Sequence, residues 1–239
     1  MTARLRLPMQ ITLNRMPRPM QSLTLTRDQR RASQMAASLL LDYPGPGFAE
    51  RLGAIEASVA ALPAPIAAEF ATFLDHARAT PQAELEAQYV ATFDVKRKCC
   101  LYLSYYTAGD TRRRGTALVA FLEAYRAAGW EFDADELPDF LPAVLELAAR
   151  SDSPVASELI AAHREGLEVL RAALERLDSP YAAVVRAVCG SLPEIDDATR
   201  ERVLALIDEG PPTETVGLSF LGNLPPFTPA GGPPEEVRT

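Results

Sequence analysis

The chain of 239 residues is 48% hydrophobic and 7% aromatic, and it carries a formal net charge of −8. This length suits one substantial domain or two small ones, and the acidic balance argues against nucleic acid as the main partner, since that would need a clustered basic surface. No apolar run approaches the roughly 20 residues that a transmembrane helix needs, so we expect no stable insertion into a membrane.

The N-terminal segment differs in charge from the rest of the chain. Its first 27 residues contain five arginines and no acidic residue. The segment lacks the apolar core and the small-residue cleavage site of a signal peptide. We expect residues 1–25 to be a basic, disordered arm; a transit-type presequence and a true start at Met20 are the alternatives.

Hydrophobic residues recur at helical spacing after this arm. Thr26 is the predicted N-cap of a first helix, which ends at Tyr43-Pro44 because proline disfavours continuation. Amphipathic helices are expected over residues 48–62 and 66–77, and Gly129 has the position of a helix C′ glycine. Asp139 is the predicted cap of a helix near Pro142. A long helix is expected over 154–177, a shorter one from 179 and a last one over 197–208.

The C-terminal end has a different composition. Residues 210–239 contain seven prolines and five glycines, which is typical of a segment without regular structure. β-branched runs and strand alternation are both scarce in the whole chain. The sequence therefore predicts an all-α, single-domain helical bundle over residues 26–208, followed by a flexible tail over 209–239.

Known catalytic motifs are missing from the sequence. It contains no nucleophile elbow, no phosphate-binding loop and no dinucleotide fingerprint. The two histidines, His76 and His163, each stand alone on a predicted helix, which is more typical of a packed residue than of a catalyst or a zinc ligand. We expect no enzyme, no catalytic residue, no metal site and no resident cofactor.

The three cysteines are an odd number and do not suggest a secreted disulfide framework, so we expect a reducing cytoplasm. Cys99 and Cys100 are neighbours on a predicted helix and would point about 100° apart, which is poor geometry for binding one metal. We interpret them as small apolar residues near the core. A redox or metal role with Cys189 as third ligand is the alternative.

Two aromatic segments suggest a binding surface. Tyr102 and Tyr106 are four residues apart, and we expect the tyrosines to occupy two faces of one helix, one of which lines a groove; the alternative is that all of them lie in the core. Residues 129–140 (GWEFDADELPDF) interleave aromatic with acidic side chains. An apolar cleft with an acidic edge would suit a short helix that has basic flanks, whereas the plainer interpretation is a solvated loop.

Three stretches carry a family resemblance. YVATFDVKRKCCLYLSYYTAGDTRRRG (89–115) is followed by ELPDFLPAVLELAA (136–149) and preceded by LLLDYP (39–44). In this order they resemble the NarJ subgroup of the TorD/DmsD/NarJ chaperones, which assist the assembly of nitrate reductase with its molybdenum cofactor. The resemblance extends over about residues 30–206.

The resemblance implies a TorD-like helical chaperone in the cytoplasm, either a monomer or a helix-exchanged dimer. Such chaperones bind the N-terminal leader of the nitrate reductase catalytic (alpha) subunit and hold it for insertion of the cofactor before membrane docking. The family pattern is Glu-x-Pro-x-Asp-His or a shorter variant, and this chain reads Glu136-Leu137-Pro138-Asp139-Phe140, so Glu136, Pro138 and Asp139 are carried over. Phe140 replaces the histidine, so roles that rest on the imidazole, nucleotide binding among them, are not transferred.

Together these observations give a first candidate site. We expect Tyr106→Ala or Asp139→Ala to lower affinity for a leader peptide with little change in melting temperature. A helical regulatory or scaffold protein without a molybdoenzyme client is the alternative function. The predicted peptide-binding residues are Tyr102, Tyr105, Tyr106, Glu136, Pro138, Asp139 and Phe140.

Overall fold

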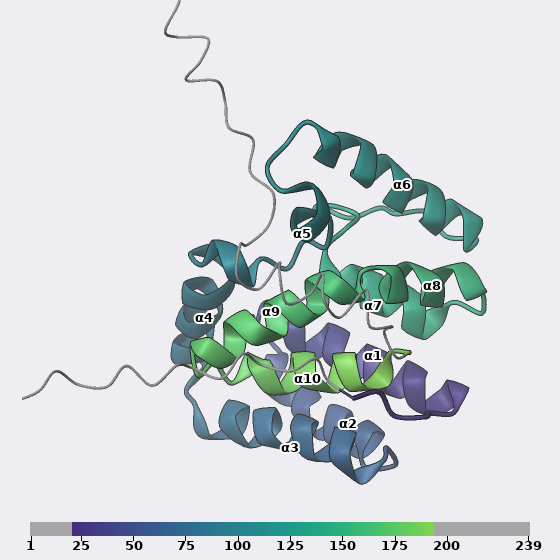
Figure 1. The fold of residues 1–239 in the computed structure, drawn as a ribbon. Helices are drawn as coiled ribbons and strands as arrows, with labels where there is room; N and C mark the ends of the chain where they lie inside the picture. The colour runs from purple at the N-terminus through teal and green to yellow at the C-terminus, as the bar shows by residue number, and fades with distance from the viewer. Residues whose placement is uncertain (1–20, 194–239) are drawn as a thin grey trace, which may run out of the picture.

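The computed structural model describes residues 21–193, which form the helical bundle in Figure 1. Within these residues the only extended pairing is an isolated bridge between Tyr102 and Phe140, so the described part of the chain is all-α, as predicted. Its α-helices are α1 (Arg27–Leu41), α2 (Phe48–Val59), α3 (Ala64–Ala79), α4 (Gln82–Tyr89), α5 (Ser104–Ala108), α6 (Arg113–Ala127), α7 (Leu141–Arg150), α8 (Pro154–Ala162), α9 (Arg164–Arg176) and α10 (Tyr181–Ser191).

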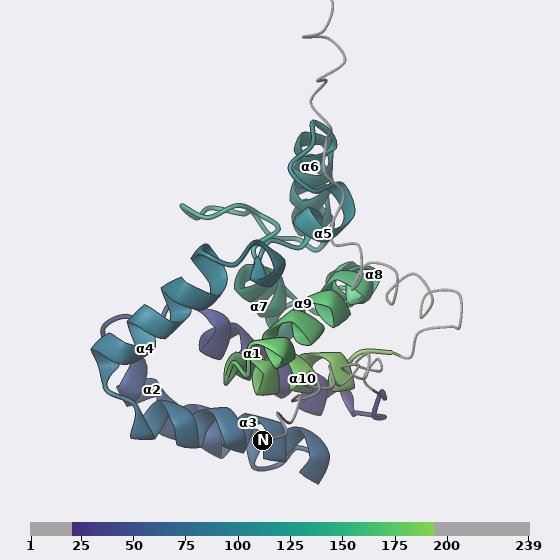
Figure 2. The same cartoon turned by 60° about the vertical axis from the view of Figure 1, so that its left-hand side comes forward.

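Helices α1 and α10 form the centre of the bundle. Helix α1 packs against α7 and α10, and α10 packs in addition against α3 and α9. Nearly every residue of α10 is buried, as expected for a helix that is apolar on all sides. Helix α6 packs mainly on α5 and α8, and Figures 1 and 2 show it at the edge of the molecule.

Two helix ends follow the local chemistry of the sequence. Thr26 caps α1 in a reciprocal capping box: its hydroxyl accepts from the Gln29 N–H (3.2 Å), and its own N–H donates to the Gln29 carboxamide (3.1 Å). Gly129 follows α6 with a φ of 81°, a left-handed conformation that favours glycine. Both predictions are confirmed.

The long helix predicted over 154–177 is in fact two helices, α8 and α9, which meet at His163. Here the backbone leaves α-helical geometry, with φ −100° and ψ 15°. The His163 ring stacks on Phe121 at 4.8 Å between centroids, and its Nδ1 lies 2.8 Å from the Leu159 carbonyl oxygen. Contact with α6 therefore accompanies a break that the sequence did not predict.

The helix predicted around Cys99 and the tyrosines is also wrong. Cys99 ends a short 3₁₀ turn, η2 (Arg97–Cys99), and Cys100 and Tyr102 lie outside any helix. Helix α5 begins only at Ser104. Tyr102 and Tyr106 are therefore not neighbours on one helix.

The start of the described chain packs against the end of α10. The Leu23 N–H donates to the Gly190 carbonyl (2.9 Å), and Leu25 is buried. Residues 21–25, which the sequence assigned to the arm, are therefore packed against the bundle. The other residues of that arm, the predicted helix over 197–208 and the tail over 209–239 lie outside the described residues.

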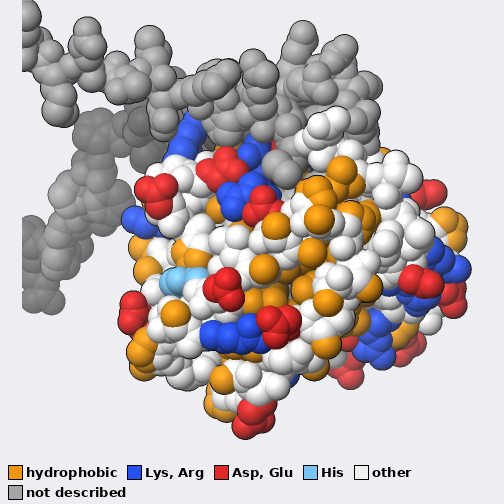
Figure 3. Space-filling model, turned by 90° about the horizontal axis from the view of Figure 1, so that it is seen from below, with side chains coloured by type: hydrophobic (Ala, Val, Ile, Leu, Met, Phe, Trp, Pro, Cys, Tyr) orange, Lys and Arg blue, Asp and Glu red, His pale blue; other side chains and the backbone are white. Residues whose placement is uncertain are grey.

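Figure 3 shows the molecule from below, where α2 and α3 lie in Figure 1. Acidic and basic side chains are interspersed on this face, and hydrophobic side chains lie between them. Among residues 21–193, no helix has the length and apolar character that a membrane span requires.

Candidate functional site

A cleft of about 240 Å³ brings together three segments that are far apart in the sequence. They are the end of α1, the turn that follows α4, and the bridged segments around Tyr102 and Phe140. We call this feature the acidic cleft. It is lined by Asp42, Tyr43, Tyr89, Phe93, Asp94, Leu101, Tyr102, Glu136 and Phe140.

A short antiparallel pairing builds one wall of the acidic cleft. The Leu103 N–H donates to the Asp139 carbonyl (2.9 Å), and the Leu141 N–H donates to the Leu101 carbonyl (2.8 Å). Tyr102 and Phe140 are directly opposite between these two bonds. Side chains of such a non-hydrogen-bonded pair lie on the same face, so both rings line the cleft, with centroids 5.5 Å apart.

A π-helical turn builds the opposite wall. Helix α4 continues into η1 (Val90–Asp94), and the Val95 N–H donates to the Val90 carbonyl (3.2 Å), five residues back. Such widened turns occur mostly within α-helices and are frequent at functional sites. Phe93 and Asp94 are adjacent in the sequence, yet both line the cleft.

Aromatic rings form the floor. Tyr89 is 5% exposed and contacts Tyr43 edge-on at 5.4 Å and Phe93 at 4.8 Å between centroids. Its hydroxyl donates to the Leu41 carbonyl (3.2 Å). Burial raises the pKa of Tyr89 far above its ordinary value, so the hydroxyl remains a neutral donor. Tyr43 is 44% exposed and leaves an aromatic surface at the mouth.

Three carboxylates, those of Asp42, Asp94 and Glu136, line the acidic cleft. None of them is in an ion pair with a lysine or arginine of residues 21–193. Glu136 accepts a hydrogen bond from the Tyr102 hydroxyl (2.7 Å). Burial, followed by the nearby Glu136 carboxylate, raises the pKa of Tyr102. The cleft thus offers negative charge beside exposed aromatic surface.

The predicted site residues separate into two groups. Tyr102, Glu136 and Phe140 line the acidic cleft, whereas the other four do not. Pro138 and Asp139 are buried behind it, and Tyr105 and Tyr106 are buried in α5.

Tyr106 is a core residue. It is 2% exposed, and its hydroxyl donates to the Cys100 carbonyl (2.7 Å). Its ring lies against Gly166 of α9 so closely that a Cβ there would come within 2.9 Å of the tyrosine. For Tyr106 the structure favours the alternative of a core position, and the expected small change in melting temperature on its truncation no longer follows.

Asp139 positions the wall of the cleft and does not cap α7, so that prediction is wrong. The residue before α7 is Phe140, and it makes no side-chain cap. Asp139 is completely buried, and its Oδ2 accepts from the Ser104 N–H (3.1 Å) and the Ser104 hydroxyl (2.5 Å). This carboxylate therefore holds the start of α5 to the bridged segment.

Six of the nine residues that line the cleft were not predicted from the sequence as site residues. The LLLDYP stretch and the start of the 89–115 stretch serve in the sequence only as landmarks of the family resemblance. These residues come together in the cleft through the π-turn and through contacts between distant segments. These residues are Asp42, Tyr43, Tyr89, Phe93, Asp94 and Leu101.

The cysteines give little support to thiol chemistry. All three are free; Cys99 and Cys189 are buried, and Cys100 is half-buried. Burial raises the pKa of Cys99 to about 11, so this thiol is protonated at neutral pH. No cluster of candidate metal ligands occurs in the part of the chain that the structure describes.

Comparison with known proteins gives a consistent picture. Residues 59–187 match the family model described as the nitrate reductase delta subunit. The chain is 38% identical over 153 residues to the nitrate reductase-like protein NarX of Mycobacterium tuberculosis, covering 64% of this chain and 23% of that protein. It is 31% identical over 150 residues to the nitrate reductase molybdenum cofactor assembly chaperone NarJ of Escherichia coli, covering 62% of this chain and 64% of that protein.

A solved structure shares the fold. The match is to a protein from Archaeoglobus fulgidus described as a redox enzyme maturation protein, with a TM-score of 0.50 and 21% identity. It covers 70% of this chain and 93% of the other. The likeness supports the predicted all-α fold class, and the secondary-structure elements of the described residues are helical throughout.

Proposed function

The chain belongs to the nitrate reductase delta subunit family, and on this premise we propose that it is a chaperone for the assembly of a nitrate reductase. Its client is the catalytic subunit of the reductase, which it recognises through the N-terminal leader. Its role is binding, not catalysis. It acts in the cytoplasm, where it holds the subunit for insertion of the molybdenum cofactor before membrane docking, and it keeps no cofactor of its own.

The observation that supports this proposal is the acidic cleft. Three carboxylates without a cationic partner among the described residues lie beside the Tyr43 and Tyr102 rings. An arginine side chain suits this cleft, because its guanidinium group pairs with carboxylates and stacks on aromatic faces. A leader that folds as an amphipathic helix would supply that arginine together with apolar anchors.

The size of the cleft limits the affinity. A volume of about 240 Å³ is below the range of about 300–1,000 Å³ typical of ligand pockets, so it suits one or two side chains and not a whole helix. Two apolar anchors would contribute roughly 3–6 kcal/mol, and ordering the peptide would cost about 2–5 kcal/mol of this. We expect Kd values in the micromolar range or weaker, which suits a chaperone that must release its client.

Calorimetric titration with a synthetic peptide tests the proposal. The peptide contains about the first 15 residues of the nitrate reductase catalytic subunit, and a scrambled peptide of equal composition is the control. Binding should depend on sequence and weaken at high salt, because the pairs at the mouth of the cleft are screened. Glu136→Gln and Asp94→Asn should each weaken binding at low salt by about 2–5-fold, the effect expected for an exposed ion pair.

Glu123→Gln is a matched control, because Glu123 is exposed on α6 and does not line the cleft. Equal losses in Glu123→Gln and Glu136→Gln would show that net charge governs binding and would remove the cleft from the proposal. No binding of the intact peptide to a folded sample would favour a scaffold role without a molybdoenzyme client.

A further inference from the structure

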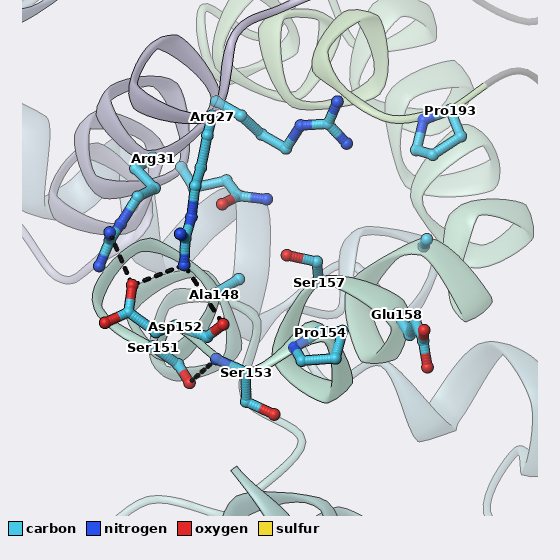
Figure 4. Close-up of a pocket in the computed structure, with 13 residues that line it drawn as sticks. Arg27, Arg31, Ala148, Ser151, Asp152, Ser153, Pro154, Ser157, Glu158 and Pro193 are labelled. Atoms are coloured by element: carbon cyan, nitrogen blue, oxygen red, sulfur yellow. Dashed lines mark hydrogen bonds and ion pairs between the residues drawn. The ribbon is translucent and has the colours of Figure 1, made fainter.

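A second and larger cavity, of about 550 Å³, lies between the first half of α1 and the start of α8. Figure 4 shows Arg31 and Asp152 on one side of it and Pro193 on the opposite side. We call it the arginine cavity. Its polar and charged lining residues are Arg27, Arg30, Arg31, Gln34, Ser151, Asp152, Ser153, Ser157 and Glu158.

Two of the three arginines already have a partner. The Arg27 and Arg31 guanidinium groups lie 2.5 and 3.2 Å from the same Asp152 carboxylate oxygen. Arg31 donates in addition to the Ala149 carbonyl (2.6 Å). Arg30 lines the same cavity, but its guanidinium group makes no hydrogen bond or ion pair within residues 21–193.

Gln34 is the second unsatisfied group in the arginine cavity. Its side chain is only 1% exposed, yet neither its carboxamide nitrogen nor its carboxamide oxygen has a hydrogen-bond partner. A buried carboxamide without partners loses the hydration it had in water. Gln34 follows Arg30 by four residues, so the two side chains share one face of α1. A ligand that satisfies both must offer an anion next to a group that donates and accepts hydrogen bonds.

The charges of the cavity favour a singly charged group. Three arginines face two carboxylates, Asp152 and Glu158, which leaves one net positive charge. A doubly charged phosphate ester would be repelled by the two carboxylates, whereas a carboxylate would balance the remaining charge. A carboxamide also pairs well with a peptide unit, which has an N–H donor and a C=O acceptor. An acidic stretch of polypeptide has both features.

We propose that the arginine cavity binds an acidic peptide segment, and that its occupant is residues 194–197 of the same chain. Pro193 lines the cavity, and the next residues are Glu194, Ile195, Asp196 and Asp197, which lie outside the described residues. Four residues reach at most about 13 Å, and attachment to the cavity wall gives them a high effective concentration. One carboxylate of this segment enters the cavity and pairs with Arg30, and a peptide unit pairs with Gln34; the other two carboxylates remain in solvent, so the cavity receives a single negative charge.

The test is hydrogen–deuterium exchange on the full-length chain. In the variant Glu194→Gln, Asp196→Asn, Asp197→Asn, the first turns of α1 and α8 should exchange roughly tenfold faster, as expected when a charge-assisted hydrogen bond is lost. Arg30→Gln should give the same increase, and combining the two changes should add nothing further, because both remove one interaction. Glu235→Gln, Glu236→Gln neutralises two acids near the C-terminus and should leave the exchange unchanged.

A peptide of residues 194–199 added in trans separates the proposed occupant from a foreign one. It should bind the variant with neutralised acids but not the wild-type chain, whose cavity is occupied. Gln34→Leu in the same background should abolish this binding while preserving the fold, because leucine fills a similar buried volume. Unchanged exchange in the variant with neutralised acids overturns the proposal, and so does peptide binding that survives Gln34→Leu.

Discussion

The acidic cleft and the arginine cavity lie at opposite ends of one helix, α1. Arg27, Arg30 and Arg31 are in its first two turns, and Asp42 follows its last residue. A helix N-terminus favours negative charge and a C-terminus favours positive charge. Both sites therefore place their charges against the helix dipole, an arrangement that lowers the stability of α1 and suits the binding of oppositely charged groups.

The two sites differ in how many of their charged side chains are already paired within the described part of the chain. Asp152 already pairs with two of the three arginines of the arginine cavity, whereas the acids of the acidic cleft have no cationic partner among the described residues. This difference indicates whether the binding partner of each site belongs to the same chain or to another protein. The partly neutralised site needs one more carboxylate, which its own chain can supply, and the unpaired acids are suited to a basic segment of another protein.

The largest expected effect separates the surface of the acidic cleft from its buried support. Tyr106→Ala should lower the free energy of unfolding by about 3–5 kcal/mol, the usual cost of removing a buried aromatic ring. Tyr102→Ala should lower it much less, because Tyr102 is only half-buried; its main effect should be on leader affinity. Urea unfolding of both variants, combined with calorimetric titration, measures the two quantities.

Tyr106→Phe is the matched control, since it removes only the hydroxyl that donates to the Cys100 carbonyl and should cost about 1 kcal/mol. A Tyr106→Ala variant that keeps its stability but loses peptide affinity would contradict this assignment. It would restore Tyr106 to the peptide-binding surface.

A smaller effect should distinguish the two sites by pH. His163 ends α8, whose first turn lines the arginine cavity, and burial lowers the pKa of His163. In the unfolded chain its pKa is about 6.5, so below that pH the unfolded state binds the proton first and gains stability. The free energy of unfolding should therefore fall as pH drops below about 6.5, by at most about 1.4 kcal/mol per pH unit from this group.

Urea unfolding between pH 7.5 and 5.5 measures the dependence, which should be flatter in His163→Gln. As the pH is lowered to 5.5, the backbone amide exchange rates should increase in α8 at a higher pH than in η1 or at Tyr102. If the variant and the wild-type chain lose equal stability, another group is responsible for the effect.

Local signals predicted the parts of the fold that depend on local chemistry. The capping box at Thr26, the C′ glycine at position 129 and the apolar stripes of α2 and α3 are each encoded within a few residues. The break at His163 coincides with the stacking of its ring on Phe121, a residue distant in the sequence. A spacing rule cannot detect such a contact.

The candidate site was predicted in part for the same reason. Tyr102, Glu136 and Phe140 were found because acids and aromatic residues cluster in the sequence around them. Asp42 and Asp94 are single acids near buried stripes, and only the packing of α1 and η1 brings them together. The position of Asp139 before an apolar run predicts a helix cap. Its burial against Ser104 accompanies the bridge between distant segments, which no local pattern predicts.

The smallest expected effect tests the dipole argument directly. Asp42→Asn removes a negative charge at the C-terminus of α1 and keeps a side-chain oxygen that can accept from the Tyr43 N–H, as Asp42 does at 2.9 Å. It should raise the free energy of unfolding by about 0.3–1 kcal/mol while it weakens leader binding. Asp28→Asn, in the first turn of the same helix, should lower stability by a similar amount and leave binding unchanged. In thermal unfolding at low salt, the two variants should change the free energy of unfolding in opposite directions. The two changes should both shrink toward zero at high salt, because salt screens the charges. If both variants change the free energy of unfolding in the same direction, the effect of each charge is set by its local neighbours and not by the helix dipole. The acidic cleft would then cause no loss of stability in α1.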